Sequence, residues 1–173
     1  RVIVGSGRLA EWKGFEDLIR AMPMILKTRK VKLLILGDGP LKEHLSQIIN
    51  ELGLKTSVDL MGYVKNPLKY YKNADVFVLS SYVEGLPNVL IEAMMCGCTP
   101  VATDCPTGPR EVLQNGKYGY LVPMKNPVLL AEGVMHALEN PISTNLLEEA
   151  IKPFGVDSVI KSHFLSLGIP LET

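Results

Sequence analysis

The 173-residue sequence predicts an α/β domain built on an open, doubly wound, six-stranded parallel sheet. Short runs rich in β-branched residues alternate with longer amphipathic stretches, which is typical of right-handed βαβ units. Several runs also place apolar residues side by side, as at residues 33–36, and this suits strands covered by helices on both faces. Ligands of open α/β sheets bind in the loops that follow the strands, so these loops form the candidate site.

The individual elements follow from the same patterns. Strands are predicted at residues 2–4, 31–36, 58–61, 76–79, 99–102 and 118–121. Helices are predicted at residues 15–27, 41–52, 67–71, 88–96, 109–113, 127–139, 145–151 and 157–167. In the second helix the apolar residues recur at the spacing of a half-buried helix, and Gly53 marks its end as a left-handed cap.

Composition limits the class of protein. The sequence is 47% hydrophobic and 21% charged, which excludes disorder and fibrous repeats, and its length fits one domain over residues 1–173. No apolar run approaches the roughly 18 residues that span a bilayer. Three cysteines are too few for a disulfide framework, so we expect a reducing, cytoplasmic location. Cys96 and Cys98 lack the spacing of a zinc site, so we expect cysteines in the core and no metal.

A net charge of zero conceals two oppositely charged parts. Residues 1–72 carry 13 basic and 7 acidic side chains, whereas residues 73–173 carry 5 and 11. The basic part either attracts an anionic ligand or the acidic inner face of a membrane, or it is a solvated surface. Lys65, Lys69 and Lys72 leave the choice between a peripheral membrane contact and a solvated helix face open. No nucleic-acid module is present, so no nucleic-acid partner is expected.

The loop after the first strand has two interpretations. Residues 5–10 fit the glycine fingerprint of dinucleotide-binding domains, and Asp38 mimics its acidic ribose ligand. However, Asp38 lies 31 residues beyond the second glycine rather than about 20, and the helical pattern begins only near Phe15. In the second interpretation, Arg8 and Lys13 bracket a glycine-flanked turn and neutralise a diphosphate, unless both are ordinary surface charges.

The segment after the fourth predicted strand is a second candidate for binding an anion. Gly85 and Pro87 define a tight turn, and Asn88 begins the next helix. The N–H groups of Val89 and Leu90 are then expected to be exposed at the positive end of the helix dipole, which favours an anion.

Two glutamates flank this turn. Glu92 lies one turn into the helix, and its carboxylate can accept hydrogen bonds from two vicinal hydroxyls such as those of a ribose. Glu84, just ahead of the helix, can hold a sugar hydroxyl in the same way. Either residue alone is explained by a charge interaction with the helix start, but the two together at this edge indicate a hydroxyl-binding site.

These residues resemble a known family. Glu84 and Glu92 have the E-x7-E form of retaining glycosyltransferases of family 4, within the pattern E-G-x-P-N-V-x-x-E-A-M-x-C-G. Leu86 stands where the family often has Phe. Further resemblances follow in the family's order over about residues 3–140, at Gly7-Arg8-Leu9, Lys13-Gly14 and residues 37–41, 62–64, 74–78, 100–103 and 115–123.

The resemblance implies one half of a GT-B enzyme, in which two Rossmann-like domains face each other. This chain is similar to the carboxyl-terminal, donor-binding half. It begins at Arg1 without an initiator Met. We therefore expect the amino-terminal acceptor domain to be missing and the fragment alone to transfer little or nothing. Residues 156–167 resemble the helix that crosses back to the other domain.

The resemblance also implies roles for the charged residues. Arg8 and Lys13 would bind the diphosphate of a nucleotide sugar and stabilise it as it departs. Glu84 would hold hydroxyls of the donor sugar, and Glu92 would hold the ribose. Such enzymes use neither a metal nor a cofactor, and their retaining transfer is thought to need no protein nucleophile, so Glu84 would position the sugar.

The remaining contacts implied by the resemblance come from turns and backbone. Gly85 and Asn88, with the backbone of Val89 and Leu90, would complete the phosphate site. The loop Gly62-Tyr63-Val64 would pass near the base.

The expected function is transfer of a hexosyl or N-acetylhexosaminyl unit from a nucleotide sugar to a glycan or lipid-linked acceptor. The variant Thr107-Gly108-Pro109-Arg110-Glu111 resembles members that use UDP-sugars in bacterial surface polysaccharide assembly, which favours UDP. The alternatives are an NAD-binding oxidoreductase domain, and a non-catalytic module that binds sugar nucleotides.

Overall fold

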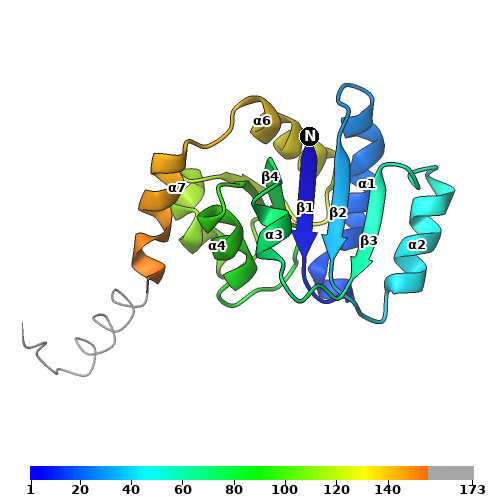
Figure 1. Ribbon diagram of the computed structural model, residues 1–173, viewed down its shortest axis with the longest axis horizontal. Helices are drawn as coiled ribbons and strands as arrows, with labels where there is room; N and C mark the ends of the chain where they lie inside the picture. The colour runs from blue at the N-terminus through cyan, green and yellow to red at the C-terminus, as the bar shows by residue number, and fades with distance from the viewer. Residues whose placement is uncertain (156–173) are drawn as a thin grey trace, which may run out of the picture.

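A computed structural model describes residues 1–155 of the chain (Figure 1). Six strands form one sheet in the order β3-β2-β1-β4-β5-β6, and every neighbouring pair is parallel. The predicted doubly wound, six-stranded sheet is therefore confirmed, and its strand order reverses between β1 and β4. The strands are β1 (Val2–Ser6), β2 (Lys32–Leu36), β3 (Val58–Gly62), β4 (Val76–Leu79), β5 (Thr99–Thr103) and β6 (Tyr120–Val122).

Helices cover both faces of this sheet. The side chains of α1, α2 and α6 pack on one face, and those of α3, α4, α5 and α7 pack on the other. The helices are α1 (Phe15–Leu26), α2 (Lys42–Glu51), α3 (Leu68–Tyr71), α4 (Asn88–Met95), α5 (Pro109–Val112), α6 (Pro127–Glu139) and α7 (Thr144–Ile151), with 3-10 turns η1 (Glu11–Lys13), η2 (Gln114–Gly116) and η3 (Lys152–Phe154).

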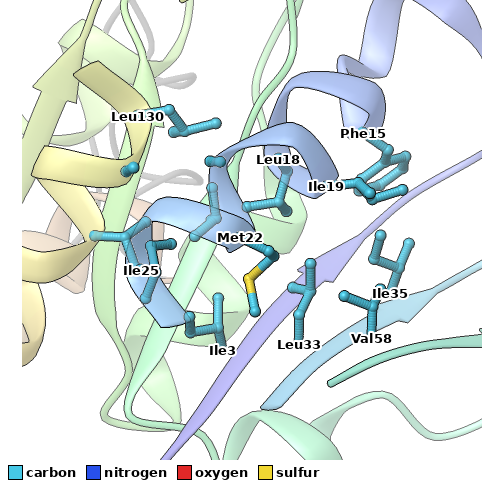
Figure 2. Close-up of a cluster of buried hydrophobic side chains, with 14 of the residues drawn as sticks. Ile3, Phe15, Leu18, Ile19, Met22, Ile25, Leu33, Ile35, Val58 and Leu130 are labelled. Carbon is cyan, nitrogen blue, oxygen red and sulfur yellow. The ribbon is translucent and has the colours of Figure 1, made fainter. Parts of the chain in front are cut away.

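The larger core lies under α1 (Figure 2). Residues three or four apart on α1 form one apolar stripe that meets β1, β2, β3 and α6. Burying each such side chain contributes about 1.5–3 kcal/mol. The stripe and its neighbours include Phe15, Leu18, Ile19, Met22 and Ile25 on α1, with Ile3, Leu33, Ile35, Val58 and Leu130 opposite.

The boundaries differ from the predicted ones where turns compete with strands. The last strand begins at Tyr120, because the N–H of Tyr118 donates to the carbonyl of Leu113 at 3.2 Å and so belongs to a turn. Gly53 follows α2 with a φ of 68°, which confirms the predicted left-handed cap. The helix predicted at residues 157–167, and the crossover helix assigned to 156–167, lie outside the described residues. Within residues 1–155, no helix is long and apolar enough to cross a membrane.

Candidate functional site

The loops after β1, β2 and β3 enclose a first hollow of about 320 Å³ at the carboxyl edge of the sheet. Three of the predicted site residues, Arg8, Tyr63 and Val64, line it, and the side chain of Tyr63 is 81% exposed. Arg8 is also exposed, so its charge is available to a ligand. The lining residues are Ser6, Gly7, Arg8, Leu36, Gly37, Asp38, Tyr63, Val64 and Pro67.

A second hollow of about 550 Å³ adjoins the first, since Pro67 lines both. Glu92 lies in this second hollow, together with Lys65 and Lys72. The helix α3 spans only four residues and Lys65 precedes it, so the three lysines of this segment do not share one helix face. The lining residues are Lys65, Asn66, Pro67, Leu68, Lys72, Glu92, Met95 and Cys96.

Lys13 and Glu84, 71 residues apart in sequence, form a largely enclosed ion pair. The Lys13 Nζ lies 2.6 Å from Glu84 Oε1, and the two side chains are only 18% and 10% exposed. The Lys13 side chain runs beside Gly7, which lines the first hollow. The structure thus brings two of the predicted site residues together next to the hollow that holds Arg8.

The segment after β4 is tied to the loop that carries Lys13. The hydroxyl of Ser80 donates to the Lys13 carbonyl at 2.8 Å, and the N–H of Tyr82 donates to the Trp12 carbonyl at 2.7 Å. Gly14 permits this close approach: its φ is 61°, and a Cβ there would lie 2.0 Å from the Ser80 carbonyl oxygen. These hydrogen bonds place Lys13 beside Glu84, and no sequence pattern predicts them.

A third loop braces the turn that holds Glu84. The hydroxyl of Thr107 donates to the backbone carbonyl of Glu84. Gly108 has a φ of 92°, and a Cβ there would lie 2.1 Å from the carbonyl oxygen of Gly85. The variant segment 107–111 therefore packs directly on the Glu84–Gly85 turn. The sequence of the segment does not predict this contact between loops.

The start of α4 offers one backbone donor. The helix begins at Asn88 as predicted. The N–H of Leu90 donates to the Pro87 carbonyl at 2.9 Å, so the prediction that this amide is exposed is wrong, because the first turn closes on itself. Among the described residues, the N–H of Val89 has no acceptor. No hydrogen bond or ion pair within residues 1–155 joins Glu92 to Glu84.

A buried tyrosine near Glu92 was also missed. Tyr71 is fully buried, and within the described chain its hydroxyl has no hydrogen-bond partner. Burial raises the pKa of Tyr71 to about 12, although the Ser6 side chain nearby lowers it, and the Glu92 carboxylate raises it further. Its sequence context, between exposed lysines, gave no signal of this burial.

The cysteines behave mostly as core residues. Cys98 and Cys105 are buried as predicted, whereas Cys96 is partly exposed in the second hollow. Burial raises the pKa of the Cys105 thiol, and the nearby Glu84 carboxylate raises it further. Across residues 1–155, no three His, Cys, Asp or Glu side chains are grouped as metal ligands would be.

A Rossmann-like sheet with cations and carboxylates at its carboxyl edge defines a nucleotide-binding class of domain. A match to a family model narrows this class to one family. Residues 1–153 match the model described as glycosyl transferases group 1. The chain belongs to this family, and its fold is one half of a GT-B enzyme.

Proteins similar in sequence to this chain are also glycosyltransferases. The N-acetylgalactosamine-N,N'-diacetylbacillosaminyl-diphospho-undecaprenol 4-alpha-N-acetylgalactosaminyltransferase of Campylobacter jejuni is 40% identical over 140 residues, which covers 81% of this chain and 38% of that protein. The lipopolysaccharide core biosynthesis glycosyltransferase LpsE of Rhizobium meliloti is 31% identical over 159 residues, or 92% of this chain and 44% of that one. The chain spans less than half the length of these relatives.

Solved structures give the same result. A complex of S. aureus TarM that contains UDP superposes with a TM-score of 0.85 at 25% identity, covering 94% of this chain and 34% of that one. Anabaena HepE in complex with UDP has a TM-score of 0.85 at 25% identity, covering 96% and 48%.

Proposed function

We propose that the chain is the donor-binding domain of a retaining, metal-independent glycosyltransferase that uses a UDP-sugar. It would transfer a hexosyl or N-acetylhexosaminyl unit to a glycan or lipid-linked acceptor. The observation that carries the proposal is the convergence of Arg8, Lys13 and Glu84 beside the first hollow, with Glu92 in the adjoining one. A nucleotide sugar needs both kinds of group, cations for its diphosphate and carboxylates for its hydroxyls.

The diphosphate is assigned to Arg8, Lys13 and the backbone of Val89. Arg8 offers forked donors, and the Val89 N–H is a donor at a helix start. The ammonium of Lys13 carries three donors, so it can contact a phosphate while it still contacts Glu84. Negative charge that develops on the diphosphate as the glycosidic bond breaks is stabilised by these groups, which is their contribution to the rate.

The nucleoside and the sugar are assigned to the two glutamates. Glu92 accepts hydrogen bonds from the ribose hydroxyls in the second hollow, and the base lies near Tyr63 and Val64. Glu84 accepts from hydroxyls of the donor sugar and orients it for attack by the acceptor. UDP is favoured as the nucleotide because the similar TarM and HepE structures contain UDP.

The acceptor is assigned to a second domain that faces this edge. Trp12, Val83 and Leu86 are exposed around the Glu84 turn, and a facing domain would cover them. The Campylobacter jejuni relative is named for a diphospho-undecaprenol substrate, which supports a lipid-linked acceptor and, with it, a peripheral contact with a membrane.

The NAD-binding alternative is weakened by the geometry of the first loop. A dinucleotide fingerprint needs its third small residue to open a helix whose N-terminus faces the pyrophosphate. Here Ala10 is extended, with φ −134° and ψ 157°, and the 3-10 turn η1 separates it from α1, which begins at Phe15.

Calorimetric titration of the chain with UDP, GDP and NAD, with and without EDTA, tests the proposal. We expect UDP to bind in the presence of EDTA, and Glu92→Ala to weaken it about tenfold or more, as loss of a charged hydrogen bond does. Glu132→Ala is the matched control, because Glu132 is exposed on α6, away from both hollows. Binding of NAD but not UDP would overturn the assignment.

A further inference from the structure

Ser81 is a buried serine that contacts the carboxylate of Glu84. It is 1% exposed, and its hydroxyl donates to Glu84 Oε1 at 2.6 Å. The same oxygen accepts the Lys13 ammonium at 2.6 Å. Ser81 is itself held in place, because its carbonyl accepts a hydrogen bond from the buried hydroxyl of Thr103 on the neighbouring strand β5.

The two oxygens of the Glu84 carboxylate differ in their hydrogen bonding. Oε1 is occupied from two directions, by Ser81 from the end of β4 and by Lys13 from η1. Among the residues that the structure describes, Oε2 has no hydrogen-bond partner. A glutamate side chain held at one oxygen loses little further conformational entropy when the other oxygen accepts a ligand hydroxyl.

We propose that Ser81 is a positioning residue that fixes Glu84 so that Oε2 accepts a hydroxyl of the donor sugar. This inference rests on the proposed function of Glu84. Ser81 does not touch the ligand in this scheme. It acts only through Glu84, and so it affects recognition of the sugar and not of the nucleotide.

The neighbouring Ser80 provides a matched comparison. It is equally buried, and its hydroxyl also makes one hydrogen bond, but to the backbone carbonyl of Lys13. Loss of the Ser80 hydroxyl would act on Lys13, which is assigned to the diphosphate that UDP and UDP-sugars share. The two serines therefore differ in which part of the donor they affect.

The test is the affinity advantage of a UDP-sugar over UDP, measured by calorimetry for the wild-type chain, Ser81→Ala and Ser80→Ala. The probes are UDP, UDP-glucose, UDP-N-acetylglucosamine and UDP-N-acetylgalactosamine. We expect Ser81→Ala to bind UDP like the wild type and to lose about tenfold of the advantage of the preferred sugar. Ser80→Ala should change the affinities for UDP and the UDP-sugar by the same factor. An advantage that is unchanged in Ser81→Ala would overturn the inference.

A second measurement separates this inference from the proposed function. A double-mutant cycle with Ser81→Ala and Glu84→Ala, followed by urea unfolding, measures the coupling of the two side chains without any ligand. We expect the folding equilibrium to show a coupling of about fivefold or more. Absence of coupling would overturn the positioning role even if UDP binds. Failure of the wild-type chain to bind any probe, with the coupling present, would instead count against the proposed function.

Discussion

At the scale of single residues, the Lys13–Glu84 pair differs from the other ion pairs that the structure describes. The others have a partner that is about one-third or more exposed, such as Arg20–Glu16 and Lys32–Asp59, and such surface pairs contribute at most about 1 kcal/mol. The Lys13–Glu84 pair is withdrawn from water at both ends. Desolvation of both groups offsets much of their attraction, so stability alone does not explain the pair, and its position fits the charged, hydroxylated ligand that we propose.

The buried hydroxyl of Tyr71 predicts an unusual substitution. Because this hydroxyl makes no hydrogen bond of normal geometry in the described residues, even to the Ser6 side chain nearby, its desolvation is not compensated. Tyr71→Phe should raise the free energy of unfolding by about 1 kcal/mol. Tyr118→Phe is the control, since the buried Tyr118 hydroxyl donates to Glu149 at 2.7 Å and its loss should destabilise. Urea unfolding of both variants tests this expectation. A lower free energy of unfolding for Tyr71→Phe than for the wild type would show that the hydroxyl is stabilising and would contradict it.

The glycine that lets the two loops approach makes a second residue-scale prediction. Gly14→Ala should cost about 2–3 kcal/mol or more in stability, because the new Cβ would clash with the Ser80 carbonyl and φ is positive. Gly53→Ala isolates the second effect: its φ is 68°, but nothing lies within 4 Å of the added atom, so about 1 kcal/mol is expected. Equal losses in thermal or urea unfolding would argue against the close loop contact.

At the scale of elements, α1 and α2 are joined at their exposed edges by one carboxylate. Glu16 on α1 accepts from Arg20 Nε at 2.8 Å and contacts His44 Nε2 on α2 at 2.9 Å. The hydrogen bond with His44, and then that with Arg20, lower the pKa of Glu16 below its ordinary 4.5. This polar contact lies at the edge of the interface between α1 and α2, which pack mainly through their apolar faces.

This contact predicts a pH-dependent contribution to stability. A lowered pKa in the folded state stabilises the protein above pH 4.5, and the contribution is lost as the pH falls through the folded-state pKa. Glu16→Gln should therefore be less stable than the wild type by about 0.5 kcal/mol near neutral pH. At about pH 2–3 the difference should vanish. Urea unfolding across this range tests the expectation, and a difference independent of pH would contradict it.

The elements themselves could be read from the sequence, because each strand and helix has its own periodicity. The strands and helices within residues 1–155 lie within about two residues of their predicted positions. Glu84 and Glu92 were singled out because they flank one turn. The way in which the loops meet could not be predicted: Ser80 and Tyr82 hydrogen-bond to the loop that carries Lys13 and so hold it beside Glu84, and contacts between residues so far apart in sequence have no local pattern. The closed first turn at Leu90 likewise depends on the orientation of one proline carbonyl.

At the scale of the whole molecule, the sheet brings distant segments to one edge. Arg8 and Lys13 follow β1, Tyr63 and Val64 follow β3, and Glu84 follows β4, so the parallel arrangement brings them all to the carboxyl edge of the sheet. The exposed apolar side chains around this edge and the partial coverage of the relatives both fit a domain that works against a second one. We accordingly expect no sustained sugar transfer from the chain alone; robust turnover by residues 1–173, measured with radiolabelled UDP-sugars, would contradict that view.

A crystal structure of the chain with UDP tests the central claim most directly, because it locates the ligand. We expect the diphosphate between Arg8, Lys13 and the Val89 N–H, the ribose hydroxyls on Glu92 and the base beside the Tyr63–Val64 loop. Glu84 Oε1 would remain bonded to Ser81, with Oε2 free for the sugar. UDP held elsewhere on the domain, or held at this edge through Asp38 with no contact to Glu92, would contradict the account.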